Sequence, residues 1–118
     1  MVREKGSDTR DSMEQGFGAR LADLNIAMEI KSTETIKQAV MAGMGVSFLS
    51  THTIGRELQA GSLTMLDVQG FPLMLHWYVV HRKNKRLPPV AQAFKAFLMN
   101  EGAQRIEQAI GVRATKPK

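Results

Sequence analysis

The feature that most constrains the fold is an alternation of strand and helix patterns between residues 26 and 49. Ile26–Ile30 is typical of a strand, Ser32 or Thr33 of the N-cap of a helix over residues 34–42, and Val46–Leu49 of a second strand. A strand, helix and strand in so few residues predict a βαβ unit with parallel strands. Such a unit directs the N-terminus of its helix toward the carboxyl edge of the sheet, where α/β proteins bind ligands.

Further elements are expected on both sides of this unit. Ser7 or Asp8 is predicted to cap a first helix whose apolar stripe runs on to Leu24, with glycines that let it pack closely. Residues 53–59 are predicted to form a short helix, and residues 63–68 and 73–81 to form strands, the last being rich in strand formers. Two prolines open a final helix. Its apolar stripe consists of Val90, Ala93, Phe94, Phe97 and Leu98.

Composition narrows the class of protein. The 118 residues fit one domain or a piece of a larger one, and the chain has no cysteine, which excludes disulfides and thiolate sites. No apolar run approaches the roughly 20 residues of a membrane span, and the first residues do not resemble a signal peptide. A cytoplasmic location without membrane contact is therefore expected.

The net charge of +5 is unevenly distributed. Residues 1–72 carry seven Lys/Arg against nine Asp/Glu, whereas residues 73–118 carry nine against two. A basic half can indicate nucleic acid or an acidic partner. No aromatic residue is interleaved with the basic clusters, however, so a stacking platform for single strands is missing. We therefore interpret the basic clusters as a solvated loop and a solvated tail.

The sequence offers little chemistry for an enzyme. It has no nucleophile elbow, no phosphate-binding loop of the Walker type and no complete dinucleotide-binding glycine motif. The histidines do not show metal-ligand spacing, because His76 and His81 lie five apart on a predicted strand and would face opposite sides. We predict no enzymatic activity, no catalytic residue, no metal and no cofactor.

Two predicted helix starts could bind an oxyanion. Ser7 and Thr9 lie at the first, after Gly6, and Ser32 and Thr33 lie at the second. A helix N-terminus carries orphan N–H donors and about half a positive charge, which suits carboxylate, phosphate or sulfate. Ser and Thr are also the commonest caps where no ligand binds, so both interpretations stay open for each site.

Several segments together resemble the effector-binding domain of LysR-type transcriptional regulators. REKGSDTR at residues 3–10 is similar to the segment that begins the second lobe of these domains, and STETIKQAVMAGMGVSFLS at residues 32–50 is similar to their most specific stretch. Gly61-Ser-Leu, Phe71-Pro, His76–His81 and residues 87–98 follow in the expected order. The resemblance covers about residues 2–100 and is greatest to regulators of RuBisCO operons.

The resemblance implies an α/β fold of the type II periplasmic-binding-protein kind, with two lobes around an effector cleft and a mixed sheet. Residues 1–84 would form the second lobe, residues 85–112 a C-terminal helix that returns to the first lobe, and residues 113–118 a disordered tail. The first lobe is incomplete in this chain. The family also implies an N-terminal helix-turn-helix, absent from these residues, through which DNA is bound. The implied ligand is a small anionic metabolite.

The resemblance also implies which residues contact the effector. They are Ser32 and Thr33 at the helix start and Ser47 and Phe48 at the following strand end, with Ser7 and Thr9 from the opening segment. The sequence departs from the family at Asp8, where a carboxylate close to a bound anion would cost on the order of 1–4 kcal/mol. Ser32 and Thr33 are therefore the first choice.

Two alternatives to an effector sensor remain, namely one lobe of a solute-binding protein for an anion and a basic nucleic-acid-binding module. The last helix carries a further expectation. Its apolar face would pack on the first lobe in the family, and without that lobe it is predicted to pair with a second copy through residues 88–110.

Overall fold

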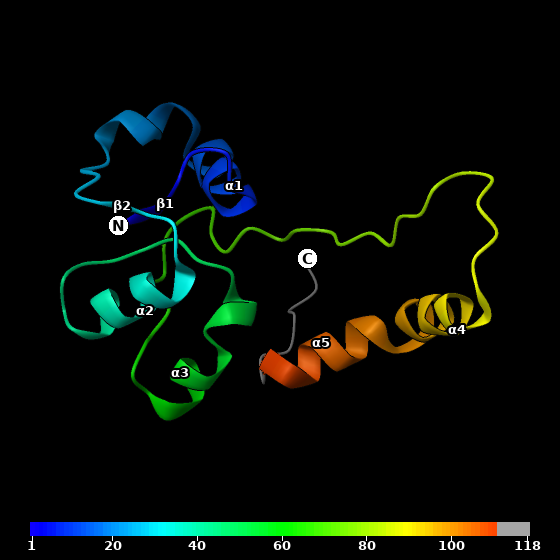
Figure 1. Ribbon diagram of the computed structural model, residues 1–118. Helices are drawn as coiled ribbons and strands as arrows, with labels where there is room; N and C mark the ends of the chain where they lie inside the picture. Colours follow the sequence, from blue (N-terminus) through cyan, green and yellow to red (C-terminus); the bar gives the residue numbers. More distant parts are fainter. Residues whose placement is uncertain (111–118) are drawn as a thin grey trace. The chain divides into compact units, whose positions relative to one another are not determined.

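The computed structural model describes residues 1–110, and it divides the chain between Leu73 and Met74 into two units. The first unit is built around a βαβ arrangement. Strand β1 (Val2–Arg3) leads into helix α1 (Asp8–Phe17), and the chain returns through the 3-10 helix η1 (Gly18–Asp23) to strand β2 (Glu29–Ile30). The two strands pair in parallel, with Val2 opposite Glu29. Figure 1 shows α1 on one side of the pair and helices α2 and α3 on the other.

Helix α1 begins as predicted but ends earlier. Ser7 is its N-cap, and its hydroxyl oxygen accepts a hydrogen bond of 3.1 Å from the backbone N–H of Arg10. The helix ends at Phe17 because Gly18 has a φ of 53°, which breaks the α-helical hydrogen bonds, and the chain tightens into η1. The prediction of one apolar stripe to Leu24 was therefore wrong beyond this glycine.

Helices α2 (Thr33–Met41) and α3 (Gly55–Ala60) follow β2, with the short 3-10 helix η2 (Thr51–Thr53) between them. Ser32 caps α2, and it is one of the two residues that the sequence predicted for this role. Gly61 ends α3 in the left-handed region with a φ of 74°, where glycine pays no steric cost. The two predicted helices are confirmed to within two residues at each end.

The core of the first unit is small and is formed by the N-terminal segment with β1, by α1, by α2 and by the residue before α3. Ile36 of α2 is completely buried. Around it the buried apolar side chains are Met1, Val2, Met13 and Ile54. A second layer is aromatic, because the Phe71 ring lies 4.7 Å from that of Phe17 and 5.6 Å from that of Phe48, between ring centroids. Phe71 also lies close to Gly16, where a Cβ would come within 3.1 Å of its ring, which explains the glycine in α1.

Three predicted strands, at residues 46–49, 63–68 and 73–81, are not strands in the described residues, whose only sheet is the parallel pair β1–β2. The predicted mixed sheet and the βαβ unit over residues 26–49 were thus wrong. Val46 does lie beside the first strand, since its carbonyl accepts a 2.9 Å hydrogen bond from the N-terminal ammonium of Met1. A single hydrogen bond of this kind does not make a β-ladder, so residues 46–49 do not form a strand. A strand needs a partner along its length, and propensity alone does not supply one.

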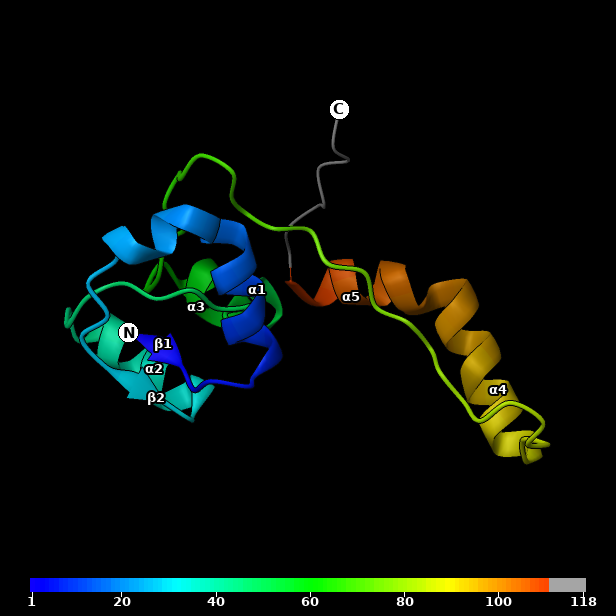
Figure 2. The same ribbon diagram turned by 90° about the horizontal axis from the view of Figure 1, so that it is seen from above.

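The second unit contains helices but very little buried surface. It begins at Met74 with an extended segment and continues into α4 (Pro89–Phe97), the π-helical turn η3 (Leu98–Gly102) and α5 (Ala103–Ile110). Figure 2 shows α4 and α5 following one another along the chain through η3. Gly102 is the one residue of its described part that is buried. The division of the family domain at residue 84 stays a prediction, and the predicted tail at residues 113–118 lies outside the described residues.

Candidate functional site

The N-terminus of α2 is the best-formed of the predicted sites. The Ser32 hydroxyl oxygen accepts a hydrogen bond of 3.2 Å from the backbone N–H of Thr35, and the Ser32 carbonyl accepts one of 3.1 Å from Ile36. The backbone N–H groups of Thr33 and Glu34 lie in the first turn, where no carbonyl of the same helix can reach them. Ser32 itself is exposed. This helix start therefore presents orphan donors to solvent, together with the positive end of the helix dipole.

Arg3 places a positive charge at this helix start, which the sequence reasoning missed. Its Nη1 donates a hydrogen bond of 2.7 Å to the Thr33 hydroxyl oxygen. The contact follows from the topology, because β1 and β2 are parallel neighbours and α2 begins directly after β2. A basic residue at the carboxyl end of β1 was the available signal. Arg3 enters the sequence prediction only within the segment that resembles the family, and no contact is predicted for this residue there.

Glu4 partly neutralises this arginine. Its two carboxylate oxygens accept hydrogen bonds from Arg3, one of 2.8 Å from Nε and one of 3.0 Å from Nη2. The hydrogen bond to Arg3 lowers the pKa of Glu4, and the same bond raises the pKa of Arg3. The arginine is thus held in one orientation while one of its faces points to Thr33.

Lys37 and Glu57 fasten α2 to α3. The Lys37 ammonium lies 2.6 Å from a carboxylate oxygen of Glu57 and 3.0 Å from one of Glu34, and the lysine is buried. The hydrogen bond from Lys37 lowers the pKa of Glu57, and the hydrogen bond to Glu57 raises the pKa of Lys37. This cluster, which the sequence reasoning also missed, fixes the orientation of α2 and hence of its N-terminus.

At the other predicted hydroxyl site, the start of α1, most of the polar groups make contacts within the fold. Ser7 caps the helix, and Thr9 is half-buried in its first turn. Arg10 is buried behind them, where it donates to the Arg3 carbonyl at 3.0 Å and forms ion pairs with Glu14 and Glu29. The loop after β1 is therefore held by structural contacts. Asp8, where the sequence departs from the family pattern, is exposed at this helix start.

Ser47 and Phe48 lie in the segment after α2. Both are half-buried, and Phe48 packs edge-on against Phe71. The Ser47 hydroxyl oxygen is buried and has no hydrogen-bond partner among the described residues. In the described part of the chain, no hydrogen bond joins Ser47 to Ser32 or Thr33. The structure thus brings Arg3 to Thr33 and leaves the role of Ser47 and Phe48 a prediction.

Two other kinds of site were searched for in the described residues. No group of three or more His, Asp or Glu side chains is arranged to hold a metal ion. No helix there is both long enough and apolar enough to cross a membrane.

Comparison with known proteins gives a consistent result. The sequence pattern of the family described as the LysR substrate binding domain matches residues 1–103. The HTH-type transcriptional regulator CbbR of Xanthobacter flavus is 47% identical over 112 residues, which are 94% of this chain and 34% of that protein. The RuBisCO operon transcriptional regulator of Allochromatium vinosum is 44% identical over 104 residues, 88% of this chain and 34% of that protein.

A third relative has a different name. The HTH-type transcriptional activator CmpR of Synechocystis is 46% identical over 98 residues, 83% of this chain and 32% of that protein. The chain thus spans about a third of the length of the curated relatives it matches. No solved structure matches it. The relatives are named as transcriptional regulators and not as enzymes, which confirms the prediction of a non-enzymatic protein.

Proposed function

This chain belongs to the LysR substrate binding domain family, and we propose that it is the effector-sensing part of a LysR-type transcriptional regulator. The resemblance to regulators of RuBisCO operons is likewise confirmed by the relatives. In the proposal, a small anionic metabolite binds between two lobes and shifts their orientation, and this movement changes how the whole regulator binds DNA. Such a regulator works in the cytoplasm, and it reaches DNA through a helix-turn-helix segment outside these 118 residues.

The observation that carries the proposal is the contact between Arg3 and Thr33 at the Ser32-capped start of α2. Orphan backbone N–H groups and hydroxyl groups converge there and favour a negatively charged ligand, next to the Arg3 guanidinium, whose charge Glu4 partly neutralises. Ser32 and Thr33 are the proposed first contacts. Ser47 and Phe48 are proposed to line the same cleft, and Ser7 and Thr9 to lie at its edge.

A chimeric regulator tests this function. The matching third of Xanthobacter flavus CbbR is replaced by this chain, and transcription from the promoter that CbbR controls is measured with and without inducing growth conditions. We expect the chimera to bind the promoter and to respond to the inducing condition. A chimera that folds and binds the promoter but never changes transcription would contradict an effector-sensing role.

We also propose that the chain self-associates through residues 88–110. The apolar face of α4 supports this, since Val90 is 78% exposed, Phe94 61% and Phe97 41%. Burying two phenylalanines and a leucine would contribute roughly 5–8 kcal/mol. Sedimentation at micromolar concentration should therefore show a dimer, and Phe94→Asp with Phe97→Asp should give a monomer. A wild-type chain that sediments as a monomer at these concentrations would contradict the pairing.

A further inference from the structure

The second unit contains an open pocket between the segment at residues 81–87 and helix α4. It encloses about 400 Å³. Its lining residues are His81, Arg86, Leu87, Gln92, Lys95, Ala96 and Met99. We propose that this pocket binds a small amphiphilic anion, meaning a phosphate or carboxylate joined to an aromatic or aliphatic group. This is a second site, separate from the start of α2.

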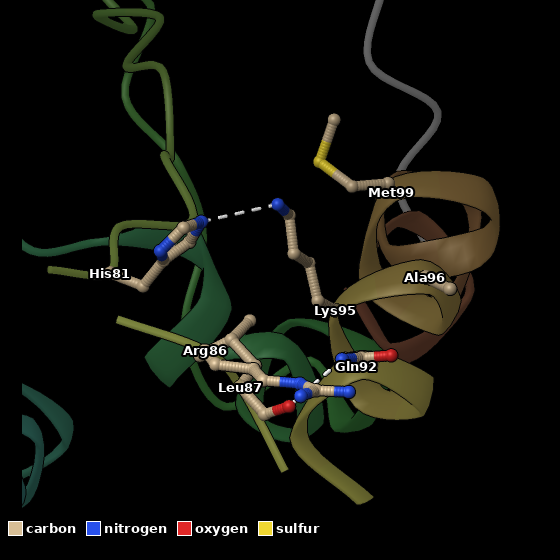
Figure 3. A pocket seen from close by; sticks show the side chains of 7 residues that line it. All are labelled: His81, Arg86, Leu87, Gln92, Lys95, Ala96 and Met99. Carbon is tan, nitrogen blue, oxygen red and sulfur yellow. Dashed lines mark hydrogen bonds between the residues drawn. The ribbon is translucent and has the colours of Figure 1, made fainter. Parts of the chain in front are cut away.

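Three hydrogen-bond contacts shape the pocket, and two of them join the segment to α4. Figure 3 shows Lys95 extending from α4 toward the His81 ring, and its Nζ lies 3.2 Å from His81 Nε2. His81 Nδ1 lies 3.2 Å from the Arg82 carbonyl oxygen, which suits the tautomer that donates from Nδ1 and accepts at Nε2. Gln92 Nε2 donates to the Leu87 carbonyl at 2.8 Å. The segment is thereby joined to α4 at both ends of the pocket.

The charge of the pocket is not compensated. No acidic residue occurs between Asp67 and Glu101, whereas that stretch contains five Lys/Arg. Neither Arg86 nor Lys95 forms an ion pair within the described residues. Elsewhere the basic side chains that point inward, such as Lys37, have carboxylate partners. A hollow with two cations and no carboxylate attracts an anion.

The apolar part of the lining indicates that the ligand carries an apolar group besides its anionic group. Leu87, Ala96 and Met99 supply a hydrocarbon surface next to the cations, and methionine adapts well to ligands of varied shape. No Phe, Tyr or Trp side chain lines the pocket, and the only ring there, that of His81, is held by Lys95 and the Arg82 carbonyl, so the pocket lacks a broad platform on which nucleic-acid bases could stack. An isolated phosphate would leave the apolar surface uncovered. An anion with a small apolar group would cover both.

The pocket does not compete with the proposed self-association. Gln92, Lys95, Ala96 and Met99 follow the i, i+3, i+4, i+7 spacing of one helix face. Val90, Phe94 and Phe97 repeat on the opposite face of α4, because each residue advances about 100° around the helix. A partner on the apolar face would therefore leave the pocket open.

The complete 118-residue chain can be titrated with phenyl phosphate, with the Met99 methyl and His81 ring signals followed by NMR. We expect saturable shifts of both signals. Arg86→Gln with Lys95→Gln should weaken binding by on the order of ten-fold, since both charge-assisted contacts are lost. The matched control is Lys83→Gln with Lys85→Gln, which removes two cations of the same run that do not line the pocket. This control should change the affinity by less than about two-fold.

Further arms separate the alternatives. Inorganic phosphate should bind more weakly than phenyl phosphate, and Ser32→Ala with Thr33→Ala should leave the titration unchanged, which separates this site from the proposed effector site. Circular dichroism should show that the variants keep their helices. Equal losses in the two cation variants, equal affinity for both phosphates, or a short DNA duplex that displaces the probe in a manner dependent on all four cations would each overturn the proposal.

Discussion

The two units of the chain differ in how far they bury apolar side chains, although the first also exposes some, such as Val46 and Leu66. The first unit buries Ile36 completely beneath its helices and holds them with ion pairs. The second exposes large apolar side chains on both its extended segment and α4, with Tyr78 80% exposed and Phe94 61% exposed. The two units also differ in net charge, since the first 72 residues are slightly acidic and the remainder is strongly basic.

This difference indicates where partners should act. A buried side chain contributes to the stability of its own unit, whereas an exposed apolar stripe contributes only when something covers it. The first unit therefore has a stability of its own that mutations can reduce. In the second unit, mutations should change association and ligand binding more than folding.

Replacing the most buried side chain should give the largest effect. Ile36→Ala removes three carbons from the centre of the core and should lower the free energy of unfolding by about 2–5 kcal/mol. The comparison is Phe94→Ala in α4, which should change it by less than about 0.5 kcal/mol because that ring is exposed. Urea denaturation at a concentration where the chain is monomeric measures both. An equal loss of unfolding free energy in the two variants would contradict the claim that the first unit is stabilised by burial and the second is not.

Arg10 provides the next effect in size. It is buried and connects α1 to the end of β1 and to Glu29 of β2. Arg10→Met keeps much of the volume but removes the charge-assisted hydrogen bonds, and should cost about 2 kcal/mol. Arg20→Met is the control, because Arg20 is exposed in η1. In thermal denaturation, the midpoint of unfolding should be lower for Arg10→Met than for the wild type and unchanged for Arg20→Met. A similar decrease in both variants would mean that Arg10 does not hold α1 to the two strands.

A smaller effect concerns the pH dependence of the first unit. The pKa of Glu57 is lowered in the folded chain by its hydrogen bond from Lys37, and that of Glu34 is lowered by hydrogen bonds from Gln38 and from Lys37. Their contribution to stability is present above the usual pKa of 4.5 and is lost as the pH falls through the lowered values. Stability measured against pH should therefore decline in acid for the wild type. The decline should be shallower in Lys37→Gln, and identical slopes would show that the cluster does not couple α2 to α3.

Local signals predicted much of the first unit. The caps were predicted to within one residue, as Ser7 or Asp8 and as Ser32 or Thr33, because a polar side chain before an apolar-periodic segment is a local pattern. The helix at residues 53–59 was predicted to within two residues, and Gly61 ends it through the local freedom of a glycine backbone. The predicted strands at residues 46–49 and 73–81 were wrong because strand formation depends on a neighbouring strand, which no local pattern specifies.

The candidate site shows the same limit. Ser32 and Thr33 could be nominated from the sequence, but Arg3 lies thirty positions from Thr33 and reaches it only because β1 and β2 are parallel neighbours. Lys37 and Glu57 are likewise distant in sequence and joined by the packing of α2 on α3. Residues that act through long-range pairing became visible only in the folded chain.

The central claim is that the start of α2 senses the effector, and the most direct test introduces Ser32→Ala with Thr33→Ala into the CbbR chimera. The account predicts that promoter binding persists while the response to the inducing condition is lost, at a folding cost of about 1–2 kcal/mol from the missing cap. Thr35→Ala, which removes an exposed hydroxyl from the same turn, should respond normally. A double variant that responds as fully as the Thr35→Ala control would contradict the account and leave Ser32 as a helix cap and Thr33 as a partner of Arg3 only.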